Sequence, residues 1–298
     1  MSRIKVTVDG RELELSNLDK VLYPAVGFTK GEVISYYTHI AEVMLPHLRD
    51  RPVTRIRYPN GVEAPSFFEK NAPTATPDWV RTETLPAPGS TKGATTLDYI
   101  VADDLPTLVW LANLAAIELH TPQWRVGHDP DLLVIDLDPG PPAGLVECCE
   151  VALWARDLLV ADGLDPLPKT SGKKGMQMSC AISGEQGADV VSGYVRQLAE
   201  LLAKRHPAKV TAVMARRHRP GKVFLDWSQN NAAKTTVTPY SLRAGATPTA
   251  SAPLTWDEVA AAAWSGGAAR QLRPDEVLAR VADQGDLWSP LLRPGPRL

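Results

Sequence analysis

An apolar run that ends in two acids, two positions apart, constrains this chain more than any other feature. Leu132–Ile135 is short and apolar, and Asp136 and Asp138 follow it before a Pro139-Gly140 turn. Side chains two apart on a strand project from the same face, so both acids would point together. The segment therefore predicts a strand whose end carries a pair of carboxylates.

Two adjacent carboxylates repel each other unless a cation neutralises them, and oxygen ligands favour Mg²⁺ or Mn²⁺. Lys222–Leu225 is a second apolar run that enters an acid, Asp226. If the two strands pair, three carboxylates meet and could hold two ions about 3.5–4 Å apart, as in sites for phosphoryl displacement. The sequence leaves open an alternative for each acid, a strand that ends in a solvated turn.

A loop rich in glycine and lysine lies between a predicted helix and a predicted strand. Thr170–Gly175 combines small residues, which let backbone N–H groups approach a phosphate, with the positive charges of Lys173 and Lys174. The spacing is not that of a Walker A loop, and no G-x-G-x-x-G motif follows a strand here. Alone, such a segment is more often a solvated hairpin turn.

Basic and aromatic side chains give weaker indications of nucleic-acid binding. Arg196–Lys222 contains eight Lys or Arg and one acid, in a chain with a formal net charge of −2. This excess suits a phosphate backbone, but it also suits a solvated helix face. Phe67-Phe68 can stack on bases if exposed, although buried core is the commoner position for such a pair. His120, after an apolar run, is more often a structural histidine than a catalytic one.

Composition and periodicity predict a cytoplasmic α+β protein. The 298 residues are 44% apolar and 22% charged, without an apolar signal core at the start, and we expect no membrane association. Three cysteines, two of them adjacent, give no disulfide framework or zinc pattern. Hairpins and helices without a regular βαβ rhythm predict α+β in one domain over 1–298. The main elements expected are a hairpin of 4–8 with 12–15, a helix from Thr29 to Pro46, an apolar helix over 105–118, and helices over 143–161 and 187–205.

Several segments, in the same order, resemble the polymerase domain of bacterial ligase D, a branch of the archaeo-eukaryotic primase superfamily. The resemblance implies a two-lobed catalytic core with mixed and antiparallel sheets flanked by helices. Because no ligase or nuclease segment accompanies the matches, the chain is similar to the stand-alone primase-polymerases associated with ligase C. The matching segments are Leu18–Pro24, Arg51–Arg55, Phe67–Asn71, Ile117–His120, Val134–Gly140, Thr170–Gly175, Phe224–Asn230 and Tyr240–Arg243.

This resemblance implies a template-dependent nucleotidyltransferase that extends primer 3′-hydroxyl ends, prefers ribonucleotides, and fills short gaps or joins ends in DNA repair. Its partners would be primer-template, gapped DNA with a 5′-phosphate, broken ends, NTP or dNTP, a DNA ligase and Ku, at the bacterial nucleoid. Two Mn²⁺ or Mg²⁺ ions would be held by Asp136, Asp138 and Asp226. The nucleotide would contact His120, Ser171, Gly172, Lys174, Gln177 and Arg243. DNA would contact Lys20 and Lys30 (downstream 5′-phosphate), Phe67 and Phe68 (template bases), and Arg219 (primer terminus).

Two positions depart from the pattern of that family. Gln177 replaces a histidine expected to bind triphosphate, and Ile56 replaces a lysine. An amide still donates a hydrogen bond but carries no charge, which Lys173 could partly supply. These departures favour the main alternative, a catalytically weak or inactive module that binds DNA ends or gaps through a 5′-phosphate. A third reading takes Asp136-Leu137-Asp138 as a dehalogenase-type phosphatase motif, but the Pro139-Gly140 turn and the position within the chain count against it.

Overall fold

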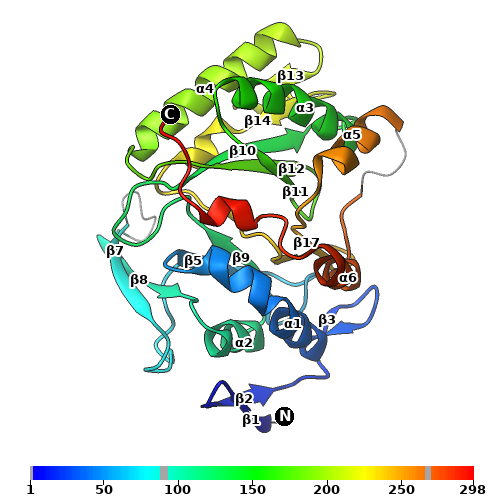
Figure 1. The fold of residues 1–298 in the computed structure, drawn as a ribbon. Coiled ribbons are helices and arrows are strands. Elements are labelled where there is room, and N and C mark those ends of the chain that lie inside the picture. Colours follow the sequence, from blue (N-terminus) through cyan, green and yellow to red (C-terminus); the bar gives the residue numbers. More distant parts are fainter. Residues whose placement is uncertain (1–2, 88–92, 266–269) are drawn as a thin grey trace. The chain divides into compact units, whose positions relative to one another are not determined.

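The computed structural model describes residues 3–87, 93–265 and 270–298, and its contacts divide the chain into two compact units (Figure 1). Unit 1 comprises Met1–Pro122, Tyr240–Ala250 and Arg273–Gly285. Unit 2 comprises Gln123–Pro239, Ser251–Leu272 and Asp286–Leu298. Each unit is built from three separate segments, so the division does not fall at a single linker. One catalytic domain over 1–298 stays a prediction.

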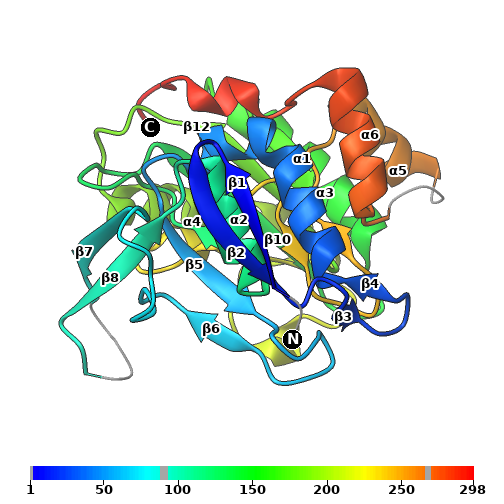
Figure 2. The ribbon, with the colours of Figure 1, turned by 90° about the horizontal axis from the view of Figure 1, so that it is seen from below.

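Unit 1 contains an antiparallel sheet in which neighbouring strands follow the order β9-β5-β8-β7, with β6 also paired to β5. The predicted N-terminal hairpin is confirmed, and Asp9 and Gly10 both take the positive φ that a tight two-residue turn requires. This hairpin lies beside α2 (Figure 2). Asn113, the last residue of α2, joins the two, since its side chain accepts from Ser16 N (3.1 Å) and donates to Glu14 O (3.0 Å). The strands of unit 1 are β1 (Arg3–Val8), β2 (Arg11–Ser16), β3 (Val21–Tyr23), β4 (Phe28–Thr29), β5 (Pro52–Arg57), β6 (Phe67–Glu69), β7 (Thr82–Pro86), β8 (Thr96–Val101), β9 (Ala116–Thr121), β16 (Leu242–Arg243) and β17 (Thr249–Ala250); its helices are α1 (Lys30–Leu48), α2 (Leu105–Asn113) and α6 (Pro274–Gln284).

The start of α1 is confirmed and its predicted end is corrected. The Thr29 hydroxyl accepts from the Glu32 N–H, while the Glu32 carboxylate accepts from the Thr29 N–H, which is a capping box. Pro46 does not end the helix, which continues to Leu48. A proline removes one backbone hydrogen bond, and here the loss falls in the last turns, where a buried apolar face still holds the helix.

The single helix expected over 105–118 is wrong in its second half. The helix α2 ends at Asn113, and Ala115 adopts a φ of +57°, which α-helical backbone cannot continue through. The strand β9 begins at Ala116. Both α2 and β9 are almost wholly buried, and in fully buried segments the apolar pattern does not separate helix from strand.

Unit 2 contains a five-stranded sheet of order β11-β12-β10-β14-β13, antiparallel except for the β13–β14 pair. Leu133, Ile135 and Leu137 of β10 belong to a core shared with the helices α3 and α4 (Figure 1). Alternation along the strand leaves Asp136 and Asp138 on the other face. The elements of unit 2 are β10 (Leu132–Pro139), β11 (Leu167–Thr170), β12 (Met176–Ala181), β13 (Val210–Thr211), β14 (Val223–Leu225), β15 (Thr236–Val237), α3 (Leu145–Ala161), α4 (Ala188–Arg205), α5 (Trp256–Ser265), and the 3₁₀ helices η1 (Arg216–His218), η2 (Trp227–Asn230) and η3 (Ser289–Leu292).

Both units combine helices with mostly antiparallel strands, so the α+β prediction is confirmed. The helices expected over 143–161 and 187–205 correspond to α3 and α4. Within the described part of the chain, no helix has the length and apolar character that a membrane span requires.

Candidate metal and nucleotide site

The sheet of unit 2 brings the three predicted acids together. Asp136 and Asp138 share one face of β10, and the β10–β14 register pairs Leu137 with Leu225. This register puts Asp226 opposite Asp136, and the Asp226 N–H donates to the Asp136 carbonyl at 2.9 Å. One carboxylate oxygen of each acid lies within 4.8 Å of the others. The strand pairing on which the third acid depended therefore exists.

The electrostatics of this acidic cluster (Asp136, Asp138 and Asp226) favour a cation. Burial, followed by the charges of Asp138 and Asp226, raises the pKa of Asp136 from 3.8 to about 7, while a hydrogen bond from Gln177 and the charge of Lys169 act in the opposite direction. Hard divalent cations prefer carboxylate oxygens and would remove this repulsion. The donor set therefore fits Mg²⁺ or Mn²⁺.

The segment after β14 holds Asp226 in place. One of its carboxylate oxygens accepts from the Ser228 N–H (3.1 Å) and from the Ser228 hydroxyl, and the other accepts from Gln229 Nε2 (3.0 Å). Asn230 anchors the segment on β10, since its side chain exchanges hydrogen bonds with Val134 N (2.9 Å) and Val134 O (2.8 Å). An N-cap aspartate makes similar bonds, so the case for Asp226 as a ligand rests on its position opposite Asp136.

The glycine–lysine loop forms a compact turn beside the acidic cluster. The Ser171 hydroxyl accepts from the N–H groups of Lys173 (3.3 Å) and Gly175 (3.2 Å), and Gly172 has a φ of +72°. A Cβ on Gly175 would lie 2.0 Å from the carbonyl oxygen of Leu137, the residue between the two acids of β10. The backbone contact that only glycine permits thus sets the loop against the strand that carries the acids, with Lys174 exposed.

Gln177 lies on β12 directly opposite Asp136. Its Nε2 donates to Asp136 Oδ1 at 3.0 Å, and its Oε1 accepts from Lys169 Nζ at 2.6 Å. Both ends of the amide are therefore bonded within the protein. The predicted contact between Gln177 and a triphosphate stays a prediction.

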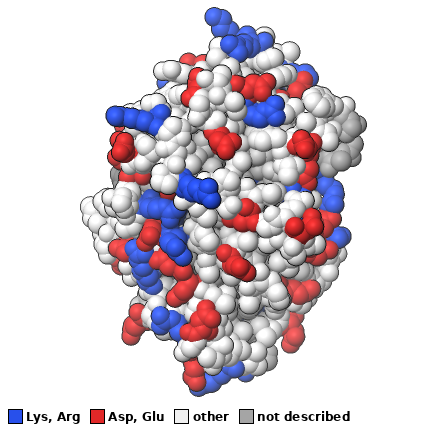
Figure 3. Space-filling view, in the orientation of Figure 1, with Lys and Arg blue, Asp and Glu red and all other residues white. Residues whose placement is uncertain are grey.

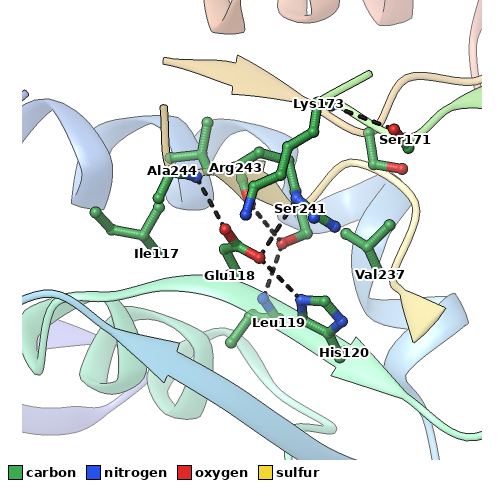
Figure 4. Close-up of polar contacts among 12 residues, drawn as sticks. Ile117, Glu118, Leu119, His120, Ser171, Lys173, Val237, Ser241, Arg243 and Ala244 are labelled. Carbon is green, nitrogen blue, oxygen red and sulfur yellow. Dashed lines mark hydrogen bonds and ion pairs between the residues drawn. The ribbon is translucent and has the colours of Figure 1, made fainter. Parts of the chain in front are cut away.

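In unit 1, the two predicted nucleotide contacts His120 and Arg243 surround a buried acid that received no role from the sequence (Figure 4). Glu118 is fully buried, and its carboxylate lies 3.1 Å from His120 Nε2 and 3.4 Å from Arg243 Nε. It also accepts from the Ala244 N–H at 3.1 Å. Because the sequence predicted a helix through residue 118, it did not show that Glu118 and His120, two apart on β9, share one face of a strand.

The two predicted phosphate-binding lysines also lie together in unit 1. The Lys30 N–H donates to the Lys20 carbonyl at 2.8 Å. The Lys30 ammonium is buried and donates to Ser16 O at 2.5 Å, whereas the exposed Lys20 donates to Asn60 Oδ1 at 3.1 Å. Burial and then the charge of Lys20 lower the pKa of Lys30 to about 8.

Of the three remaining predicted DNA contacts, two are aromatic residues of unit 1 and one is an arginine of unit 2. Phe67 and Phe68 on β6 are 50% and 62% exposed, so they are not core residues, and Ile56 pairs with Phe68 across β5 and β6. Arg219, in unit 2, places its guanidinium 3.7 Å from the ring centre of Phe224, which pairs with Asp138. On the face drawn in Figure 3, positive and negative side chains are interspersed rather than separated into large patches.

Known proteins are similar to this chain in sequence and in fold. The family model described as LigD, primase-polymerase domain matches residues 29–288. The multifunctional non-homologous end joining protein LigD of Mycolicibacterium smegmatis is 44% identical over 284 residues, which cover 94% of this chain and 36% of that protein. The bifunctional non-homologous end joining protein LigD of Bacillus subtilis is 34% identical over 250 residues, 83% of this chain and 39% of that protein.

A solved structure, the polymerase domain from Mycobacterium tuberculosis ligase D in complex with DNA, matches with a TM-score of 0.88 and 41% identity over 95% of this chain and 99% of that one. The fold class expected from the resemblance is therefore confirmed. The chain spans little more than a third of the length of the curated relatives above. The match over residues 29–288 shows that this chain belongs to the LigD primase-polymerase domain family, a family of nucleotidyltransferases.

Proposed function

We propose that this protein is a template-dependent DNA polymerase and primase that adds nucleotides, preferentially ribonucleotides, to primer 3′-hydroxyl ends with two Mn²⁺ or Mg²⁺ ions. The observation that carries the proposal is the convergence of Asp136, Asp138 and Asp226 on one face of a single sheet. Membership of the LigD primase-polymerase family supports nucleotidyl transfer as the reaction.

The three acids would hold the ions, and bound divalent ions neutralise charge at the attacking oxygen and on the leaving pyrophosphate. The protein's own contribution is position. The bond from Asp226 N to Asp136 O and the clamp of Asn230 on Val134 fix two strands that carry the acids. Such preorganised geometry supplies much of the rate enhancement in phosphoryl transfer.

We assign nucleotide contacts to Ser171, Gly172 and Lys174 because their loop turns against the acid-bearing strand with backbone N–H groups and an exposed ammonium. His120 and Arg243 are assigned the same task in unit 1, where Glu118 holds both side chains. Gln177 completes the proposed set through its bond to Asp136.

We assign the downstream 5′-phosphate to Lys20 and Lys30, since two neighbouring ammonium groups, one of them buried, favour binding of an anion. Exposed Phe67 and Phe68 offer faces for template bases, where stacking contributes about 1–3 kcal/mol per base. We assign the primer terminus to Arg219 because its guanidinium lies on the ring of Phe224, and Phe224 pairs with Asp138.

The named relatives are non-homologous end joining proteins, which favours short-gap filling or end joining as the task of this chain. We propose that it acts on gapped or broken DNA in the bacterial cytoplasm, at the nucleoid, together with a DNA ligase and Ku.

Primer extension on a gapped duplex tests the proposal. The assay compares rNTP with dNTP, Mn²⁺ with Mg²⁺, and phosphorylated with unphosphorylated downstream strands. We expect templated addition that favours rNTP, Mn²⁺ and the 5′-phosphate, and that is lost in Asp138→Ala but kept in the control Asp157→Asn, whose side chain is exposed on α3. Tight binding of the phosphorylated gap without incorporation would instead support the alternative, a DNA-end-binding module without catalysis.

A further inference from the structure

Three polar side chains form a row across the sheet of unit 2, and the row ends at the acidic cluster. Lys169 on β11 pairs with Gln177 on β12, and Gln177 pairs with Asp136 on β10. Their exposed fractions are 2%, 5% and 8%. Adjacent strands therefore place an ammonium, an amide and a carboxylate side by side in the interior.

Lys169 uses all three of its ammonium hydrogens. Its Nζ donates to Gln177 Oε1 (2.6 Å), Ser251 Oγ (2.6 Å) and Val237 O (3.0 Å). The Trp288 ring lies 5.4 Å away and adds a cation–π contact. Burying an ammonium is costly unless its donors are bonded, and here they are. The lysine is thus fixed in position by three hydrogen-bond acceptors and one aromatic ring, which come from four separate parts of unit 2.

This fixed lysine determines which way the Gln177 amide points. An ammonium has donors and no acceptor, so only the amide oxygen can face Lys169. The amide nitrogen must then face Asp136, as the 3.0 Å bond to Oδ1 shows. A flipped amide would set N–H against N–H at Lys169 and oxygen against oxygen at Asp136.

We propose that Lys169 and Gln177 are positioning residues of the metal centre: Lys169 fixes the Gln177 amide, and Gln177 holds one oxygen of Asp136 so that the other is presented to a divalent cation. The inference rests on the proposed function only in taking the acidic cluster as a cation site. Partners of metal ligands that lie outside the coordination sphere orient those ligands, and their loss typically weakens metal binding about 10–100-fold.

The test measures the binding of Mn²⁺ in the absence of DNA and nucleotide. Free Mn²⁺ is quantified by its electron paramagnetic resonance signal. We expect Lys169→Met and Gln177→Leu each to weaken binding about tenfold or more, while Asp136→Asn loses it and the control Lys5→Met, exposed on β1, matches wild type. Gln177→His should retain most of the affinity, because a neutral imidazole can accept from Lys169 and donate to Asp136.

A double-mutant cycle separates positioning from general loss of packing. If Lys169 acts through Gln177, Lys169→Met combined with Gln177→Leu should weaken Mn²⁺ binding no more than Gln177→Leu alone. Additive losses, or folded single variants that bind within about twofold of wild type, would overturn the inference. Circular dichroism confirms folding, and Gln177→Leu together with Gln177→His decides the matter if Lys169→Met does not fold.

Primer extension by the same wild-type preparation keeps the two proposals distinguishable. Wild type that binds Mn²⁺ with the predicted variant pattern but does not extend primers contradicts the polymerase proposal and supports the positioning inference. If wild type extends primers but neither Lys169→Met nor Gln177→Leu changes the affinity for Mn²⁺, the polymerase proposal is supported and the positioning inference is contradicted.

Discussion

Replacing Asp136 by asparagine should stabilise the metal-free protein at neutral and alkaline pH. Burial and the neighbouring carboxylates raise the pKa of Asp136 from 3.8 to about 7 in the folded state. A difference of about 3 in pKa corresponds to about 4 kcal/mol by linkage. Asparagine has no charge to bury, and its carbonyl oxygen still accepts from Gln177 Nε2.

The sign follows from the raised pKa. Below about pH 4 the carboxyl is protonated in both folded and unfolded states, so it imposes no penalty. Between about pH 4 and pH 7 the unfolded state is ionised while the folded state keeps its proton, so wild type progressively loses stability relative to Asp136→Asn until the folded carboxyl ionises at about 7. The stability gap between the two proteins should therefore widen from near zero at pH 4 to its full value above pH 7.

Urea unfolding in EDTA at pH 5 and pH 8 measures this gap, with Asp157→Asn as a control that removes an exposed carboxylate. Saturating Mn²⁺ at pH 8 should stabilise wild type but not Asp136→Asn. If Asp136→Asn is less stable than wild type at pH 8 in EDTA, or if the gap does not grow with pH, the raised pKa of Asp136 and the repulsion within the acidic cluster are refuted.

Three further outcomes are expected. Glu118→Gln, which removes the carboxylate beside His120 and Arg243, should raise KM for the incoming nucleotide about tenfold in single-nucleotide incorporation kinetics; an unchanged KM counts against its role. The preference for a 5′-phosphorylated gap should fall as the pH rises through about 8, where Lys30 loses its charge, and Lys30→Gln should lack the preference at every pH; a preference equal at pH 7 and pH 9.5 contradicts this. Gly175→Ala should destabilise by about 1–3 kcal/mol or more in urea unfolding, since its Cβ would meet the Leu137 carbonyl, whereas Gly193→Ala, with open space on α4, should not; a Gly175→Ala variant as stable as wild type would refute the close packing of the loop.

The acidic pair could be predicted from the sequence because its geometry is local. Period-two alternation alone places Asp136 and Asp138 on one face of a strand. Asp226 is different, because only the β10–β14 register brings it to the pair, and this register pairs residues about 90 apart in sequence. From the sequence, the third carboxylate could therefore be predicted only on the condition that the two strands pair. The structure meets that condition.

The residues that the sequence missed depend on distant partners. Two of the three acceptors of the buried Lys169 ammonium, Val237 and Ser251, follow it by more than 60 residues. Glu118 similarly acquires its meaning from Arg243. The merged helix over 105–118 failed for another reason, because complete burial removes the polar positions that distinguish the two periodicities.

Anomalous scattering at the manganese edge, from crystals of the protein soaked in saturating Mn²⁺ with a non-hydrolysable NTP, shows whether the acidic cluster binds the metal ions. We expect manganese peaks in direct contact with carboxylate oxygens of Asp136, Asp138 and Asp226. Manganese bound elsewhere, with these three side chains free of any ion, would contradict this expectation.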